Sequence, residues 1–439
     1  MENLTDNALP PLPPQRKFAL GSALRHRNYR LFFTGQGLSL IGTWMQSTAL
    51  PWLVYEETHS TTLLGVLGFA SAILSFGVAP LAGVFADHHD RRRILYVTQS
   101  LAMTQALILA ALTLTGVIQV WHIVLLAMFS GLIMGFDVPA RQSFVVDIVG
   151  DKQDLPNAIA LNSFIFNSAR MVGPAVAGLL ISILGDSRRG EGIIFLINAA
   201  SFLTLLAALP AMKIIPRPRP AETPRVLHSL KEGFDYAIGF RPILALLMLL
   251  SFVTLVGAQY TVLLPDFAQE VLHGNSRTYG FMISSIGVGA LCGALFLARR
   301  RSVLGLEKVV AVAPLIFGAG LVGFSFSRWI PLSLALLLVS GLGIMIQMAG
   351  SNTLLQTIVD DDKRGRVMSF YAMAFMGAAP FGSLIVGALA AKISSPTTVL
   401  IGGCLCMAAS LAFMRVLPAF RAMVRPVFER MGILPPASP

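Results

Sequence analysis

Arg170 is the residue whose position in this sequence points most directly to chemistry. It lies about 12 residues into an apolar run that covers about residues 158–184. A helix spanning a membrane would therefore hold this charge near the middle of the bilayer, where it must face a cavity or a partner. Two roles fit: binding an anionic group of a substrate, or holding a carboxylate that carries a coupled proton. The structural alternative is an ion or carbonyl pair buried between helices.

Acidic residues that could act with Arg170 are scarce in the apolar runs. None of the 22 aspartates and glutamates falls at the centre of a run, and Asp137 comes closest. At a rise of ~1.5 Å per residue it lies about 24 Å from Trp121, near the inner edge of a hydrocarbon core of about 30 Å. We treat Asp137 as a candidate proton-coupling site. Arg141, four residues later, offers a simple ion pair on the same helix face as the alternative.

Glu56 and Asp266 are weaker candidates for proton coupling. Both lie at the ends of apolar runs, on the side of the membrane opposite to Asp137.

Uncharged polar residues in the apolar runs could line a substrate path. Gln36, Ser39 and Gln46 are separated by three and seven residues in the first run, so they share one face of a helix. Such a face meets either a cavity or another helix, and each residue alone could equally form a helix–helix hydrogen bond. The other candidates for the lining are Gln259, Tyr260, Gln347 and Asn352.

A dense charge cluster, residues 83–93, separates two apolar runs at about 61–86 and 94–116. Its eleven residues hold one glycine, two aspartates, two histidines and three arginines. Lipid would not tolerate this density, so a tight cytoplasmic turn between transmembrane helices is expected. Asp87 could accept helix N-terminal amides or an arginine from a neighbouring span, which would make the turn a latch. The alternative is a solvated turn that only signals topology.

The elements that must position these residues are membrane-spanning helices. The chain has 439 residues, of which 55% are hydrophobic and 13% charged, with a mean hydropathy of +0.72. A soluble domain would carry about 25% charged residues. A span with its loop needs about 35 residues, so about twelve helices fit. The predicted spans cover about residues 29–55, 61–86, 94–116, 121–141, 158–184, 191–212, 242–265, 278–298, 308–327, 330–352, 367–391 and 397–417.

The basic residues alternate between the two sides of this arrangement. With these spans, 27 of the 33 lysines and arginines fall on one side, which the positive-inside rule assigns to the cytoplasm together with both termini. The net charge of +11 therefore reflects topology, and no basic soluble domain for nucleic acid is present.

The order of the spans predicts five segments. They are a proline-rich cytoplasmic tail (1–27), a six-helix bundle (28–212), a cytoplasmic linker (213–241), a second six-helix bundle (242–417) and an amphipathic cytoplasmic tail (418–439) that Pro426 is expected to break.

Nothing in the sequence indicates an enzyme or a cofactor. It has no phosphate loop, no carboxylate pair at a catalytic spacing and no His/Cys ligand set for a metal. His88 and His89 are too small a set and lie among arginines. The cysteines Cys292, Cys404 and Cys406 fall in apolar spans, where they are expected to pack as small hydrophobic residues.

The two halves of the chain repeat with an offset of 210 residues. Gly83 then aligns with Gly293 and Arg91 with Arg301, and the tripeptide Ser-Gly-Leu at 130–132 recurs at 340–342. Matching loops and six helices per half predict a parallel repeat about an axis along the membrane normal, with the substrate path between the halves. In the second copy Leu297 replaces Asp87, so any latch is asymmetric.

The pattern in residues 83–93 resembles the loop after the second helix of the major facilitator superfamily, Gly-x-x-x-Asp-x-x-x-Arg-Arg. Gly83, Asp87, Arg91 and Arg92 fit it, whereas His88 and Asp90 depart from the general pattern. The Asp-Arg-Arg variant is similar to that of the drug and siderophore (enterobactin-type) exporter branch, the drug:proton antiporter-3 or transmembrane-secretion-effector type.

This resemblance covers about residues 28–417 and implies a function. Residues 83–93 would govern the conformational switch. Gly173, Pro174 and Gly178 resemble a shortened antiporter motif, in which a bend in span five seals the path against ion leak.

The expected protein is a monomeric twelve-helix carrier of the inner or plasma membrane that exports amphipathic small molecules by alternating access and proton antiport. Proton coupling follows from the resemblance alone. An uptake carrier of the same fold and a membrane scaffold without transport are the alternatives.

Overall fold

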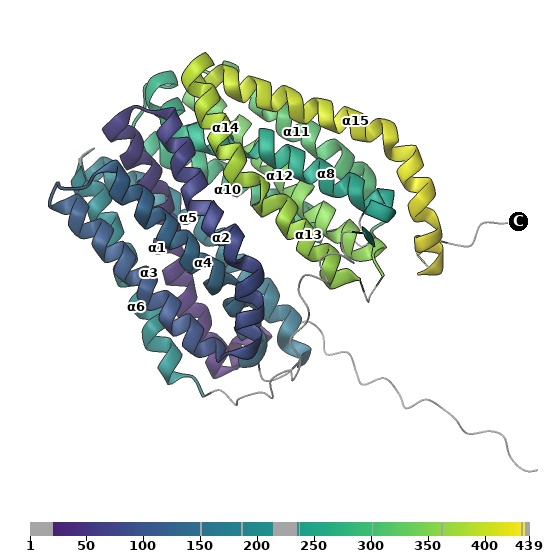
Figure 1. The fold of residues 1–439 in the computed structure, drawn as a ribbon, viewed down its shortest axis with the longest axis horizontal. Helices are drawn as coiled ribbons and strands as arrows, with labels where there is room; N and C mark the ends of the chain where they lie inside the picture. Colours follow the sequence, from purple (N-terminus) through teal and green to yellow (C-terminus); the bar gives the residue numbers. More distant parts are fainter. Residues whose placement is uncertain are drawn as a thin grey trace, which may run out of the picture.

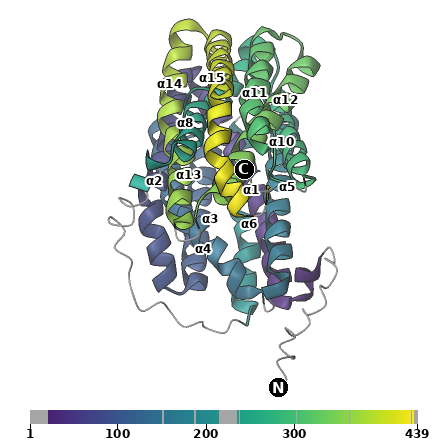
Figure 2. The ribbon, with the colours of Figure 1, turned by 90° about the vertical axis from the view of Figure 1, so that its right-hand side faces the viewer.

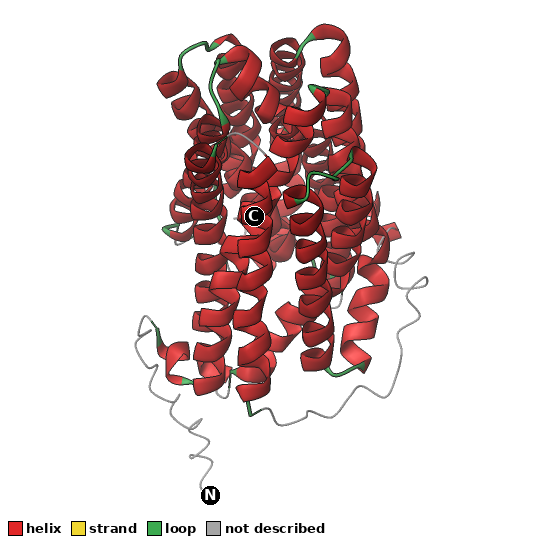
Figure 3. Ribbon diagram, turned by 90° about the vertical axis from the view of Figure 1, so that its left-hand side faces the viewer, coloured by secondary structure: helices red, strands yellow, loops and turns green. Residues whose placement is uncertain are grey.

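A computed structural model describes residues 21–149, 152–185, 188–213, 235–236, 238–300, 302–360, 363–431 and 433–434. Every regular element in these ranges is a helix (Figure 3). Most of the predicted linker, and the predicted N-terminal tail as far as residue 20, lie outside the described residues.

The first bundle consists of six long helices (Figure 1). A short 3-10 helix, η1 (Ser22–Arg25), precedes it, and η2 (Lys152–Asp154) joins its fourth and fifth helices. The six are α1 (Arg27–Thr58), α2 (Thr61–His88), α3 (Arg91–Leu114), α4 (Val120–Ile148), α5 (Leu155–Leu184) and α6 (Arg188–Ala211).

The second bundle has six spans, two of which are interrupted. The seventh span of the chain, which is the first of this bundle, contains α8 (Arg241–Val256), η3 (Ala258–Leu263), α9 (Leu264–Asp266) and η4 (Phe267–Val271). The following spans are α10 (Ser276–Ala298), α11 (Leu306–Phe326), α12 (Ile330–Ile358), α13 (Arg364–Met376) continued by α14 (Ala378–Ile393), and α15 (Ser395–Arg430). Seen from the side in Figure 2, the helices of both bundles run roughly parallel.

The predicted fold class is confirmed: an all-α membrane protein with twelve spans in two bundles. Among the described residues, 11 helical segments are long and apolar enough to cross a membrane. The twelfth is α1, whose polar side chains, including Gln36 and Gln46, lower its hydropathy. Its 32 residues still exceed the roughly 20 that a bilayer requires.

The internal repeat is visible in the helix boundaries. Helix α4 begins at Val120 and ends at Ile148, and α12 begins at Ile330 and ends at Ile358, each 210 residues later. The repeat therefore makes residues of α4 and α12 structural counterparts.

Prolines explain the two interrupted spans. Pro380 lacks the N–H that would bond to the carbonyl of residue 376, and the helix is interrupted next to that residue, at Gly377. Pro265 likewise cannot donate to residue 261, which lies in the 3-10 segment η3.

The C-terminal segment differs from the expectation. Helix α15 continues without a break through Pro418 and Pro426 to Arg430. Phe420, Val424 and Phe428 are buried and belong to the large apolar core, so packing compensates for the backbone bonds that the prolines remove.

Candidate transport site

Two crossings of glycine-bearing helices join the bundles. A Cβ added to Gly178 of α5 would lie 2.9 Å from the Cα atom of Gly280 in α10. A Cβ added to Gly65 of α2 would lie 3.1 Å from the Cα atom of Gly387 in α14. Only glycine allows backbones to approach this closely in a membrane. The repeat relates α2 to α10 and α5 to α14, so the two crossings are symmetry mates.

Both crossings lie toward one end of the molecule. We call the end that carries residues 88–91, 298–300, 302–306, 358–360 and 363–364 the basic face, and the other end the opposite face. Near the opposite face, Tyr55 donates a 2.6 Å hydrogen bond to Asp266 across the bundles. In contrast, a Cβ on Gly77 or Gly83, toward the basic face, would meet nothing within 4 Å. The bundles therefore close against each other at the opposite face.

Further contacts reinforce this closure. Trp52 of α1 stacks on Tyr279 of α10 with ring centroids 5.7 Å apart. His59 lies 3.7 Å from Glu270, with both side chains more than half exposed. Glu56, the other weak proton candidate, is partly buried at the same end of α1.

Arg170 lies where α5 meets both α1 and the second bundle. Its guanidinium carbon is 5.7 Å from the ring centroid of Trp44. Tyr260 of η3 lies near its guanidinium. The main-chain carbonyl of Arg170 would contact a Cβ added to Gly287 of α10. No carboxylate among the described residues lies within ion-pair distance of Arg170, so its charge meets aromatic groups instead.

The predicted antiporter motif surrounds this arginine. Gly173 faces α1, where a Cβ would lie 2.6 Å from the Cβ of Trp44. Pro174 is buried, and its carbonyl faces Gly280 across the bundles. Gly173 and Gly178 thus serve two different contacts, one within the first bundle and one between bundles.

Asp137 is buried inside the first bundle, with 2% of its surface exposed. It forms the expected ion pair with Arg141. Its Oδ1 atom also accepts 2.8 Å hydrogen bonds from Thr98 and Gln99 of α3. Ser39 of α1 donates to Gln99 at 3.4 Å. These contacts tie the carboxylate to two side chains of α3 and to one of its own helix.

The polar stripe of α1 points into the same bundle. Gln46 donates to Gln105 at 3.0 Å and accepts from Asn198 at 2.7 Å, which links α1 to α3 and α6. Gln36 is 1% exposed, and its Oε1 atom has no hydrogen-bond partner among the described residues. Ser39 and Gln46 therefore make the helix–helix hydrogen bonds that were the alternative to a substrate lining.

The candidates in the second half are distributed differently. Gln347 is fully buried and lies 3.4 Å from Ser351. Gln259 accepts a 2.9 Å bond from Ser383 of α14, next to the crossing with α2. Asn352 accepts a bond from Gln356 on its own helix. The buried hydroxyl of Tyr260 has no partner in the described part of the chain.

Residues 83–93 form the end of α2 and the start of α3. Asp90 caps α3 by accepting from the amides of Arg92 and Arg93. Arg91 forms a 2.8 Å ion pair with Asp147 of α4, within the first bundle. Asp87 lies in α2, and its side chain is outside the described residues.

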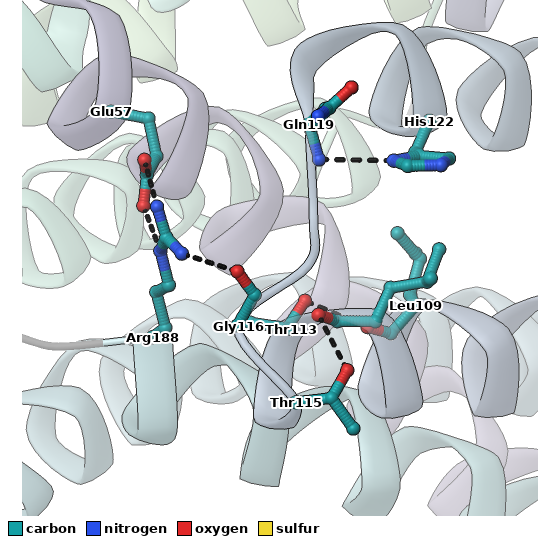
Figure 4. Close-up of polar contacts among 9 residues, drawn as sticks. Glu57, Leu109, Thr113, Thr115, Gly116, Gln119, His122 and Arg188 are labelled. Atoms are coloured by element: carbon teal, nitrogen blue, oxygen red, sulfur yellow. Dashed lines mark hydrogen bonds and ion pairs between the residues drawn. The ribbon is translucent and has the colours of Figure 1, made fainter.

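A clasp holds the first bundle together at the opposite face (Figure 4). The guanidinium of Arg188 binds both carboxylate oxygens of Glu57, at 2.5 and 2.7 Å, and donates to the carbonyl of Gly116. Glu57 lies beyond the predicted first span, and this hydrogen bonding lowers the pKa of its carboxyl below the ordinary value. The loop beside the clasp is fixed by the amide of Gln119, which donates to the His122 ring.

Several functional candidates were not recognised in the sequence. Gln99, Gln105 and Asn198 are polar residues inside apolar spans, so the criterion that selected Gln36 would have found them. Trp44 carried no such signal, because an aromatic residue in a membrane helix is ordinary.

Two six-helix bundles related by an internal repeat, with a charged residue at their junction, define a major facilitator transporter, which is not an enzyme. The sequence profile of the family described as transmembrane secretion effector matches residues 19–429. The chain belongs to this family.

Curated relatives cover most of the chain. It is 27% identical to the staphyloferrin A transporter of Staphylococcus aureus, over 81% of this chain and 88% of the relative. It is 24% identical to the multidrug efflux pump Tap of Mycolicibacterium fortuitum, over 81% and 86%. It is also 24% identical to the enterobactin exporter EntS of Shigella boydii, over 84% and 86%.

Solved structures share the fold at low sequence identity. The nucleoside transporter NupG superposes with a TM-score of 0.71 at 14% identity, covering 88% of this chain and 99% of the other. A bacterial homologue of ferroportin in an inward-facing state gives a TM-score of 0.68 at 15% identity, with 90% and 98% covered.

Proposed function

We propose that this protein exports amphipathic small molecules by alternating access, driven by proton antiport. The observation that carries the proposal is the pair of glycine crossings, Gly65–Gly387 and Gly178–Gly280, which close one face of a two-bundle transporter. The basic face lies in the cytoplasm with both termini, the protein acts as a monomer in the inner or plasma membrane, and the described arrangement is the inward-facing state.

Arg170 is the proposed anchor for substrate. It is held over Trp44 and beside Tyr260, and no described carboxylate neutralises it. A cation flanked by aromatic rings binds an anionic, planar group better than a lipophilic cation. Relatives named for staphyloferrin A and enterobactin support siderophore-like anions as the substrate class.

Substrate charge distinguishes this role from a structural one. Arg170→Gln removes the charge and keeps much of the side-chain length, so export of anionic substrates falls at least about tenfold, which corresponds to ~1.4 kcal/mol. Export of an uncharged amphipathic compound falls less. Equal losses for both, with normal folding, would make Arg170 a packing residue.

Asp137 is the proposed proton site. Its carboxylate is buried and pairs with Arg141, Thr98 and Gln99, so protonation would break an ion pair and loosen α3 and α4 against each other. The basic-face residues Gly83, Asp87, Arg91 and Arg92 would then form the contacts that shut the cytoplasmic end in the outward-facing state. Leu297 at the repeat position makes that closure one-sided.

Substrate-dependent proton flux in proteoliposomes tests the proposal. A pH dye inside the vesicles reports flux for wild type and for Asp137→Asn, with catecholate siderophores, macrolide-like drugs and lipophilic cations offered in turn. Flux that disappears in a variant that still folds supports antiport through Asp137. If flux survives, another carboxyl carries the proton, and Asp266 and Glu56 are the first to test. Substrate movement without proton flux rejects antiport.

Two alternatives make different predictions in the same vesicles. An uptake carrier would accumulate substrate in right-side-out vesicles under an inward proton gradient, whereas an exporter accumulates it in inside-out ones. A scaffold would move no substrate in either orientation, with or without Arg170.

A further inference from the structure

A groove opens on the first bundle, away from the second bundle. It has a volume of about 630 Å³ and lies between the end of α2, the first half of α3 and the middle of α4. Helix α3 packs on α4 and α6 of its own bundle, and Figure 1 shows α3 and α6 on the side of that bundle far from the second. We call this feature the α3–α4 groove. Its size is within the range of about 300–1,000 Å³ typical of small-molecule sites.

The body of the groove is apolar and faces the bilayer. Phe85, Val97 and Leu101 line it and are 42%, 55% and 40% exposed. Phe129 and Phe136 of α4 form the opposite wall. In a membrane-spanning chain, apolar side chains exposed away from the other bundle contact lipid acyl chains.

The mouth of the groove is charged and lies at the basic face. Arg93 lines it, with 88% of its side chain exposed. It forms a long ion pair with Asp90, at 3.7 Å, and because both side chains are exposed to solvent this pair is weak. Asp90 is itself engaged, because its Oδ1 atom accepts from the amides of Arg92 and Arg93. The guanidinium of Arg93 is thus available to an anion from the membrane surface.

His89 completes the mouth. Its ring stacks on Phe85 with centroids 3.9 Å apart, and its Nδ1 atom lies 3.0 Å from the Phe85 carbonyl. The stacked rings mark the boundary between the charged mouth and the apolar body.

We propose that the α3–α4 groove binds one anionic phospholipid of the leaflet at the basic face. The polarity of the groove follows that of a lipid in this leaflet: a cation at headgroup level, then an apolar wall that extends about 12 Å along α3 from Arg93 to Leu101. The phosphate binds Arg93, and an acyl chain lies between Val97 and Phe129. This inference rests on the groove alone and holds whether or not the protein exports its substrate by proton antiport.

The groove also reaches the buried polar cluster. Thr98 lies in its wall, is 5% exposed and donates to Asp137. A bound acyl chain would therefore close the lipid side of the Asp137 cluster against water.

Quenching of a tryptophan by brominated lipids tests the site. Phe129→Trp places an aromatic reporter in the groove wall, and Leu125→Trp places one on the same helix, 54% exposed but outside the lining. Each is reconstituted with brominated phosphatidylglycerol or brominated phosphatidylcholine, and the wild-type signal is subtracted. We expect phosphatidylglycerol to be preferred about fivefold at position 129, the factor that one basic residue contributes near an anionic surface. At position 125 no preference is expected.

The headgroup contact is tested in the Phe129→Trp background. Arg93→Glu abolishes the preference, whereas Arg299→Glu, an exposed arginine at the start of the corresponding loop of the second half, leaves it intact. The proposal is overturned if position 129 shows no headgroup preference or if the preference survives Arg93→Glu. It is also overturned if a transported substrate displaces the lipid at its working concentration, because the groove would then be a substrate site.

Discussion

The interiors of the two bundles differ in charge at corresponding positions. In the first, Asp137 and Arg141 of α4 form a buried ion pair, to which Thr98 and Gln99 add hydrogen bonds. The 210-residue repeat aligns these two positions with Gln347 and Ser351 of α12, which make a single neutral contact at 3.4 Å. The corresponding helix therefore forms without the charges, so we infer that the first bundle keeps them for function.

The side-chain hydrogen bonds and ion pairs also differ between the two bundles. In the first bundle Gln46 connects α1 to α3 and α6 through Gln105 and Asn198. In the second bundle the ion pair between Glu307 and Arg421 lies at the basic-face edge, with the arginine 40% exposed. We infer that the first bundle carries the chemistry and the second mainly provides a packing surface.

Giving the first bundle the residues of the second is the strongest test of this comparison. Asp137→Gln combined with Arg141→Ser should reduce substrate-dependent proton flux at least about tenfold, a change equivalent to ~1.4 kcal/mol. Asp137→Asn alone should also destabilise the fold by about 3–5 kcal/mol, because it leaves the buried Arg141 uncompensated. Thermal unfolding in detergent should show that the double variant recovers most of that loss.

The matched control is Gln347→Leu in the second bundle. It removes the neutral contact and should change flux by no more than about twofold, equivalent to ~0.4 kcal/mol. A loss of flux as large as that of the first-bundle variants would contradict the division of roles.

The crossings between bundles come next in expected effect. Gly178→Val inserts a side chain where even a Cβ would lie 2.5 Å from the Ser276 carbonyl. We expect the closed state to lose about 1–3 kcal/mol. Spin labels at His59 and Glu270, in a background without the native cysteines, should report a longer distance. Gly77→Val, where the space is open, should leave the distance unchanged, and equal shifts in both variants would refute the crossing as the closure.

The ion pair between Glu307 and Arg421 in the second bundle should have a smaller effect on stability. Glu307→Gln removes the partner of a partly exposed arginine, so the free energy of unfolding should fall by about 1–2 kcal/mol, between the values for exposed and buried pairs. Transport at permissive temperature should be unchanged. A specific loss of transport without a lower melting temperature would give this pair a functional role.

The clasp at the opposite face should have the smallest effect. The pKa of Glu57 is lowered by its hydrogen bond from Arg188, so its contribution is present at neutral pH and is lost as the pH falls through that lowered value. Because both side chains are partly exposed, Glu57→Gln should cost less than about 1 kcal/mol at pH 7. Melting curves of wild type and variant should converge on acidification; a gap that persists in acid would exclude the ion pair as its cause.

The sequence predicted the fold well because its determinants are local. Apolar runs of sufficient length, basic loops and the 210-residue repeat each identify spans without knowledge of contacts. The boundaries of α4 and α12 agree with that repeat. The break expected at Pro426 failed because tertiary packing of Val424 and Phe428 outweighs a local backbone preference.

The site was less predictable because it depends on which way side chains face. The sequence made Asp137, Arg141 and Arg170 candidates because a charge in lipid is costly. It could not distinguish a stripe that faces a path from one that faces a helix, and Ser39 and Gln46 face helices. The pairing of Arg170 with Trp44 needs two helices in register, which no spacing within one helix reveals.

The break at Gly377 has a mechanical consequence. Helix α14 is clamped to α2 by the glycine crossing, whereas α13 packs on α8 and α12 of its own bundle. Because Pro380 removes a backbone hydrogen bond at the junction, the eleventh span should bend there rather than move as one rigid helix. The basic-face end of the second bundle can then move with α13, while α14 keeps its contact with α2 at the opposite face.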